Sequence, residues 1–158
     1  MLPEEITKLI GKSGEPIIYD VERGAIRKFA DCIGDRNPLI WDDEYARNSK
    51  YGSVVAPPGF FGWPVKWDYP MPFVSAIRDE LIAAATKAGY SRIVDGGIEF
   101  EFFSPVRAGD TLVVVTKVSD IYAKETKGNT LVFSVTETSY TNQDGILVGL
   151  VRQTLINR

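Results

Sequence analysis

Apolar and polar positions in the first part of the chain recur at the spacing of helices. In EEITKLIGKSG, Ile6, Leu9 and Ile10 lie on one side of a helix and a glycine follows, which predicts a short amphipathic helix. The next segment, EPIIYDV, has the composition of a short strand.

ERGAIRKFADCIG predicts a longer helix, because its apolar side chains return every three or four positions. The predicted core residues of this helix are Ile26, Phe29, Ala30 and Ile33. Asp20 is the expected N-terminal cap and Gly34 the expected stop. The helix would place Asp35 at the start of the loop GDRNPLIW. DDEYARNSKYG then predicts another short helix, with acidic residues at its N-terminus where the helix dipole favours them.

Residues 56–67, APPGFFGWPVKW, combine prolines with large aromatic side chains. Pro58 suits a first helical turn, because its missing N–H would lack an intrahelical partner anyway. We therefore expect the buried helix of the fold to begin there, with the N–H of Gly59 free to polarise a ligand carbonyl. The aromatic residues would fill the core or line an acyl or polycyclic pocket, and they are Phe60, Phe61, Trp63 and Trp67.

FVSAIRDELIAAATKAG predicts an amphipathic helix that ends at Gly89. A proline-rich break, DYPMP, separates this helix from the preceding segment, so we interpret the stretch from about residue 67 to 92 as a helical insertion.

The second half of the chain is rich in strand-forming residues. The four predicted strands lie in GGIEFEFFSPV, DTLVVVTKVSDIYAKE, NTLVFSVTETSYT and GILVGLVRQTLIN. Short connections between them predict an antiparallel meander. Helices followed by four strands predict one α+β domain over residues 1–158, with a curved antiparallel sheet wrapped around a central helix.

Composition limits the cellular compartments and the classes of partner that we expect for this chain. The chain has 158 residues and a net charge of −3, with acids and bases spread along it, so we expect no nucleic-acid partner. No apolar run approaches the roughly 20 residues of a membrane span. The start MLPEEITKLI carries two acids where a signal peptide would need basic residues. These features predict a cytoplasmic protein with no membrane partner.

The chain contains no histidine, which removes Ser–His, Cys–His and His–metal mechanisms supplied by this chain alone. Cys32 lies in the apolar helical pattern beside Phe29 and Ile33, so we expect a small buried packing residue rather than a nucleophile. Sequence patterns typical of metal and nucleotide sites do not occur. We therefore expect neither a metal nor a nucleotide cofactor.

Four segments in succession resemble the MaoC-like hot-dog hydratases, and they are AIRKFADCIGDRNPLIWDDEYA, VVAPPGFF, GGIEFEFFSPVRAGDTL and TNQDGILV. The order is most similar to the branch related to the dehydratase domain of type-I fatty acid synthase, and the resemblance covers about residues 17–156. It implies a hot-dog fold and the addition or removal of water across the α,β double bond of an enoyl thioester, without any cofactor. The acyl group would be carried on CoA or acyl carrier protein. The resemblance also implies a second hot dog, because in this family the acyl tunnel runs along the dimer interface.

The family motif carried onto this sequence gives Asp35, Asn37 and Pro38, with Ile40 at the histidine position. The family's aspartate and histidine hold a water molecule and shuttle its proton, which isoleucine cannot do. Asp35 and Asn37 are thus the candidate catalytic residues. The resemblance places the oxyanion donor near Pro58 and Gly59, where proline replaces the family's histidine. The candidate substrate-binding residues are Pro58, Gly59, Phe60, Trp63 and Arg107.

Three interpretations of the loop remain open. Asp35 and Asn37 could simply hydrogen-bond the local backbone. Alternatively, the chain is the non-catalytic half of a hydratase whose second hot-dog subunit carries the histidine, which is the interpretation we prefer. In the third, a homodimer binds acyl thioesters without turnover. Arg107 in SPVRAGD would pair with CoA phosphates at the tunnel mouth or remain solvated.

Overall fold

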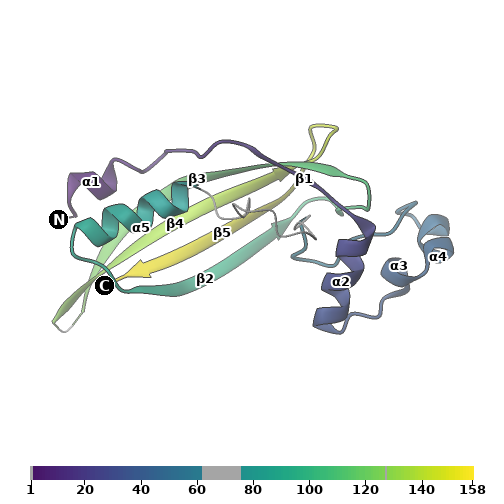
Figure 1. Ribbon diagram of the computed structural model, residues 1–158, viewed down its shortest axis with the longest axis horizontal. Coiled ribbons are helices and arrows are strands. Elements are labelled where there is room, and N and C mark those ends of the chain that lie inside the picture. Colours follow the sequence, from purple (N-terminus) through teal and green to yellow (C-terminus); the bar gives the residue numbers. More distant parts are fainter. Residues whose placement is uncertain (1, 62–75, 127) are drawn as a thin grey trace.

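The computed structural model describes residues 2–61, 76–126 and 128–158 of the chain (Figure 1). Predictions that concern Trp63, Trp67 and the other residues from 62 to 75 lie outside this part of the chain. Among the described residues no helix is both long and apolar enough to cross a membrane.

The described residues form a five-stranded antiparallel sheet, and four of its strands come from the second half of the chain, as predicted (Figure 1). Its strands are β1 (Ile17–Asp20), β2 (Ile93–Phe102), β3 (Thr111–Thr126), β4 (Asn129–Thr141) and β5 (Leu147–Asn157). Register shifts between Asp95 and Gly97, Val118 and Asp120, and Tyr140 and Thr141 interrupt the pairing. Such bulges bend strands and increase their twist, so they favour a curved sheet.

The order of the strands is β1-β3-β4-β5-β2, which corrects the predicted meander. Only β3, β4 and β5 follow one another as neighbours, whereas β2 lies at the far edge beside β5. The connection from β2 to β3 therefore crosses the end of the sheet. It hydrogen-bonds other loops on its way, because the N–H of Ala56 donates to the oxygen of Val106 (2.8 Å) and that of Gly109 to Val21 (2.8 Å).

The helices pack on one face of the sheet and at its end (Figure 1). They are α1 (Glu4–Thr7), α2 (Arg23–Ile33), α3 (Pro38–Trp41), α4 (Asp43–Asn48) and α5 (Ala76–Lys87). Within the stretch predicted as an insertion, α5 lies along the sheet and buries Ile77, Leu81 and Ala85. Whether the stretch 67–92 is an insertion stays a prediction.

Two clusters of buried side chains form the core. One joins α2 and the loop after it to β3 and β5, and includes Ile26, Ile40 and Leu112. The other joins α1 and α5 to β3 and β4, and includes Ile6 and Leu81. Both clusters use the same face of the sheet, so α5 and the loop after α2 lie over its two ends.

Three details of the predicted α2 are wrong. Glu22, not Asp20, precedes the helix, and no side chain caps it. The Oδ1 atom of Asp20 instead accepts a hydrogen bond from the hydroxyl of Thr111 at 2.9 Å, so this carboxylate links β1 to β3. Cys32 and Ile33 are exposed, because the sheet contacts only the face of α2 that carries Ile26 and Ala30.

Candidate active site

The loop after α2 keeps its shape through its own polar side chains. Gly34 ends the helix in the left-handed conformation (φ 73°). The Oδ1 atom of Asp35 accepts from the N–H of Asn37, and that of Asn37 accepts from the N–H of Leu39, each at 3.0 Å. These are the turn-forming bonds of the local interpretation. They leave Oδ2 of Asp35 without a hydrogen-bond partner among the described residues.

Ile40 occupies the position at which the resemblance places a histidine. It lies in α3, whose first residue is Pro38 and whose N-terminal cap is Asn37. The side chain is only 2% exposed and packs in the core cluster with Ile26 and Ala30 of α2. The position is therefore an apolar one, and it supplies no group that exchanges protons.

Arg27 of α2 holds the far end of this loop. Its Nε donates to the carbonyl oxygen of Ile40 (3.0 Å) and its Nη2 to that of Trp41 (3.2 Å). The indole N–H of Trp41 in turn donates to the backbone oxygen of Asp35 at 2.7 Å. The loop is thus fixed at both ends, independently of any proton-transfer chemistry. Sequence reasoning missed Arg27, because its partners are backbone atoms that no motif records.

A pocket of about 390 Å³ brings the loop and the Pro-Gly segment together. Among the candidate site residues, those that line it are Asp35, Asn37, Pro58, Gly59 and Phe60. Ile40 lies in the same wall. Among the described residues on the walls, Asp35 carries the only carboxyl group, and most of the others are aliphatic or aromatic. The pocket suits an apolar group with one polar end.

The segment from Pro58 to Phe61 corrects the prediction that a helix begins at Pro58. The chain turns here, because the N–H of Phe60 donates to the oxygen of Pro57 (3.1 Å) and Gly59 has a positive φ of 88°. That conformation suits glycine and ends helical geometry. The N–H of Gly59 has no hydrogen-bond partner within the described part of the chain, so it is available to an acceptor in the pocket.

Phe60 and Phe61 are core residues whose rings also border the pocket. Phe60 is 3% exposed and its ring centre lies 5.3 Å from that of Phe29. Phe61 stacks on Tyr140 with centroids 4.2 Å apart. Burial raises the pKa of the Tyr140 hydroxyl.

Arg107 does not line this pocket. Its Nε donates to the backbone oxygen of Tyr51 at 3.2 Å, and its N–H donates to Oδ2 of Asp110 at 2.7 Å. The side chain is half-buried at a bridge between Val55 and its own backbone. Its role with phosphate stays a prediction.

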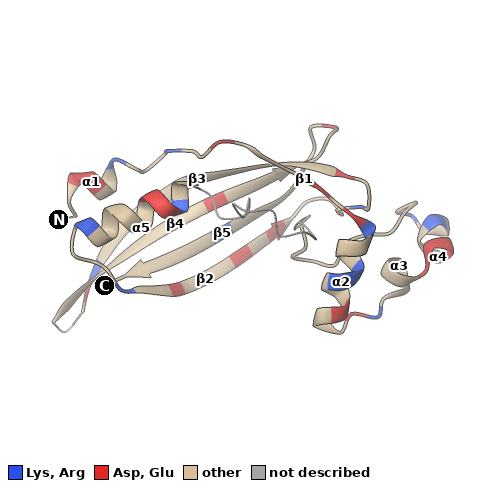
Figure 2. Ribbon diagram, in the orientation of Figure 1, with Lys and Arg blue, Asp and Glu red and all other residues tan. Residues whose placement is uncertain are grey.

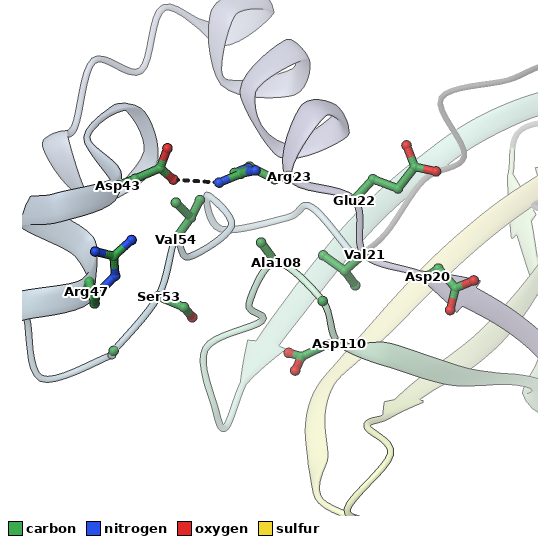
Figure 3. Close-up of a pocket in the computed structure, with 12 residues that line it drawn as sticks. Asp20, Val21, Glu22, Arg23, Asp43, Arg47, Ser53, Val54, Ala108 and Asp110 are labelled. Atoms are coloured by element: carbon green, nitrogen blue, oxygen red, sulfur yellow. Dashed lines mark hydrogen bonds and ion pairs between the residues drawn. The ribbon is translucent and has the colours of Figure 1, made fainter.

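A second pocket, of about 670 Å³, lies between the start of α2, α4 and the turn before β3 (Figure 3). Asp43 pairs there with Arg23 (3.0 Å) and with Arg27 (3.3 Å). The hydrogen bond from Arg23, helped by that from Arg27, lowers the pKa of Asp43 although desolvation opposes it. This pocket is larger, but Asp35 and Gly59 lie elsewhere, so the smaller pocket is the better candidate.

The aromatic wall of the smaller pocket was not predicted as part of the site. Phe102 and Phe103, at the end of β2, line it. The rings of Phe100 and Phe102 lie parallel, with centroids 6.0 Å apart. The signal was present in the sequence, because aromatic and acidic residues alternate in IEFEF and so point to opposite faces of the strand.

Metal-binding groups do not gather in the described residues, where no three His, Cys, Asp or Glu side chains come together. The described walls of the smaller pocket offer one carboxylate, backbone N–H groups and an apolar surface.

Comparisons with known proteins agree over most of the chain. Residues 8–150 match a family model for the FAS1-like dehydratase domain region. A UPF0336 protein of Saccharopolyspora erythraea is 35% identical over 152 residues, which cover 94% of this chain and 88% of that protein. A probable enoyl-CoA hydratase alpha subunit of Thermomonospora curvata is 31% identical over 137 residues, or 83% of this chain and 43% of that protein.

Solved structures give the same picture of the fold. The ChsH1-ChsH2 complex of Mycobacterium tuberculosis contains a chain with a TM-score of 0.76 and 20% identity, covering 97% of this chain and 93% of that one. A chain of the HadBC 3R-hydroxyacyl-ACP dehydratase complex of the same organism has a TM-score of 0.68 and 24% identity. The match covers 96% of this chain and 98% of that one.

Proposed function

The chain belongs to the family of FAS1-like dehydratase domains and has the hot-dog fold of the MaoC-like dehydratases, and on this premise we propose that it is one subunit of an enoyl-thioester hydratase. The reaction adds the hydroxyl of water to the β-carbon and a proton to the α-carbon, or removes both from a 3-hydroxyacyl thioester. The substrate is carried on CoA or acyl carrier protein, and the reaction needs no cofactor. We place this enzyme in the cytoplasm, in acyl-thioester metabolism.

The buried Ile40 beside Asp35 is the observation that supports assigning substrate binding and proton transfer to two different subunits. Hydration needs a group that takes up and releases a proton near neutral pH, and His is the side chain that does so unperturbed. This chain has no histidine. We therefore assign it the substrate-tunnel half, and assign the proton shuttle to a second hot-dog subunit that carries the histidine.

The edge strand β2 supports such a partner. It pairs with β5 on one side only, so among the described residues its other edge is unpaired. Ile98, Phe100 and Phe102 are 43–54% exposed along one face of this strand. An unpaired edge beside an apolar stripe favours the addition of another strand. Two similar structures are themselves complexes of two named subunits.

Within this chain, the pocket residues bind and orient the acyl thioester. The N–H of Gly59, which has no hydrogen-bond partner among the described residues, would donate to the thioester oxygen as negative charge develops on it. Pro58 and Phe60 would hold the apolar part of the substrate, and Trp63 would extend this wall. Asp35 and Asn37 would fix the loop, with Oδ2 of Asp35 facing water. Arg107 would meet a phosphate of the carrier at the tunnel mouth.

A reconstitution experiment tests the proposal directly. The purified chain, a histidine-bearing hot-dog chain encoded nearby and the 1:1 mixture are each assayed for hydration of crotonyl-CoA and longer enoyl-CoAs. We expect activity from the mixture and none from this chain alone. Hydration by this chain alone at the rate of the mixture would show that Ile40 is no obstacle and that the division of labour is wrong.

Ile40→His tests the position itself. An imidazole here would lie beside Asp35, so the variant should hydrate crotonyl-CoA without the partner. We expect a rate at least about 100-fold above that of Ile40→Asn, which is polar but has no shuttle. Both variants lose stability, by about 1–3 kcal/mol, because each buries a polar group. Equal inactivity of the two folded variants would mean that position 40 is not the proton-shuttle position.

The alternative is a homodimer that binds acyl thioesters without turnover. The apolar pocket of about 390 Å³ favours binding whether or not a partner exists. Calorimetric titration of the isolated chain with a saturated acyl-CoA measures this binding. Tight binding, together with no gain of activity from any histidine-bearing hot-dog chain, supports the alternative over the hydratase.

A further inference from the structure

The sheet has a second face, opposite the helices, that nothing covers within the described part of the chain; we call it the open face. Its residues on β4 are the odd-numbered ones, since Val132, Ser134 and Thr136 face the core. On this face Tyr122 and Phe133 stack in parallel, with ring centroids 4.9 Å apart.

A row of alternating charges crosses the middle of the open face. Register aligns Lys117 of β3 with Glu137 of β4, Arg152 of β5 and Glu99 of β2. Lys117 and Arg152 both pair with Glu137, at 2.8 and 2.9 Å. Arg152 also reaches Glu101, the next acid on the same side of β2, at 3.2 Å. Figure 2 shows acidic positions recurring along β2. Glu99 has no ion-pair partner among the described residues.

Apolar rows lie on either side of these charges. Towards the β3–β4 hairpin, register aligns Tyr122, Phe133, Ile156 and Val94 across the four long strands. Towards the other end it aligns Val113 with Thr141 and Leu147. Val94, Val113 and Leu147 are 37–46% exposed, so apolar surface reaches solvent on both sides of the charged row.

We propose that the open face binds the open face of a second copy of this chain, back to back, through a two-fold axis that runs parallel to the strands between β4 and β5. This operation lays β3 over β2 of the second copy and β4 over β5. Lys117 then faces Glu99 of the second copy, and Glu137 faces Arg152. Tyr122 faces Val94, and Phe133 faces Ile156.

The charges favour this axis over two other possible two-fold axes. An axis along the charged row would place Lys117 on Lys117 and Glu137 on Glu137 of the second copy. An axis through β4, the middle strand of five, would also stack Glu137 on itself. Like charges at such distances oppose association, whereas the apolar rows favour it in any orientation. The interface leaves the unpaired edge of β2 free, so it is compatible with a hot-dog partner there and does not depend on the proposed function.

Two single charge reversals and their mixture test the proposal. Lys117→Glu places acids opposite acids, and Glu99→Lys places bases opposite bases, so each variant alone should self-associate at least about tenfold more weakly. Mixed 1:1, the two variants regain both opposite-charge pairs and should associate like the wild type. Sedimentation velocity measures the dissociation constants, and Lys28→Glu on the exposed side of α2 is the matched control.

The mixing result distinguishes the open face from the edge of β2, because an edge-paired dimer has no contact between positions 117 and 99. Circular dichroism establishes that each variant is folded before it is mixed. Recovery in the mixture, with loss in each variant alone, supports the interface. A wild type that is monomeric at about 100 μM, or association that the single variants leave intact, or failure of the mixture to recover, overturns it.

Discussion

Phe61 packs flat against the sheet because position 149 carries no side chain. A Cβ on Gly149 would lie 2.7 Å from Cε1 of Phe61 and 3.3 Å from the backbone oxygen of Glu101. Gly149→Ala therefore forces the ring away from Tyr140, on which it stacks. Overpacking of this kind costs about 1–3 kcal/mol, and denaturant titration should show that loss in the free energy of unfolding.

Gly14→Ala is the matched control, since the nearest atoms to its Cβ would lie at 3.7 Å, an ordinary contact distance. Its free energy of unfolding should stay within about 0.5 kcal/mol of the wild type. Equal effects of the two substitutions would show that loss of glycine, and not the contact with Phe61, sets the stability.

Single residues were predictable where their partners lie a few positions away. Gly34, Asp35 and Asn37 form turns with their own neighbours, so the sequence indicated their hydrogen bonds. Asp20 was misassigned because its partner, Thr111, is 91 positions distant. Cys32 was misassigned because helical spacing does not reveal how wide a stripe of α2 the rest of the fold covers.

Glu137 ties three strands together at the scale of the sheet. The hydrogen bond from Lys117, and to a lesser extent that from Arg152, lowers its pKa below the ordinary 4.5, while desolvation opposes the shift. Its contribution to stability is therefore complete above the pKa of the unfolded chain and is lost as the pH falls through the lower folded value. Between about pH 5 and pH 3 the wild type should lose more unfolding free energy than Glu137→Gln.

The measurement is a series of denaturant titrations across that pH range. Glu44→Gln is the control, because Glu44 lies on α4, away from the open face, and no ion pair within the described residues involves it, so its curve should run parallel to that of the wild type. Parallel curves for Glu137→Gln and the wild type would contradict the assignment of acid sensitivity to this carboxylate.

Elements were predicted better than their arrangement. Strand composition and turn signals located β2 to β5, but they could not place β2 beside β5, since pairing across a long connection depends on where the loops dock. The turn at Pro58 shows the same limit. Proline suits a helix start, yet the positive φ of Gly59 next to it produces a turn.

The whole molecule presents the unpaired edge of β2 to its surroundings. Ile98 is 54% exposed on that strand, so a charge there can block strand pairing without disturbing the core. If the proposed function holds, Ile98→Lys should prevent activation by a histidine-bearing partner while leaving the thermal midpoint unchanged. Gel filtration of the mixture and its hydratase assay measure the effect.

Ile10→Lys provides the comparison at a site far from that edge, since Ile10 follows α1 and is 45% exposed. This variant should be activated normally. Full activation of Ile98→Lys would place the partner on another surface of the molecule.

The buried Ile40 also bears on how such a chain could change over generations. Asp35, Asn37 and Arg27 hold the loop through bonds that involve only the backbone of position 40 and not its side chain, so a histidine at that position could be lost while the fold survived. Burying an isoleucine contributes about 1.5–3 kcal/mol, a sizeable part of the stability of a small domain. Return to histidine would give that stability up. In a gene pair where one copy keeps the histidine, the replacement in the other copy is therefore hard to reverse. Each chain then depends on the other for activity.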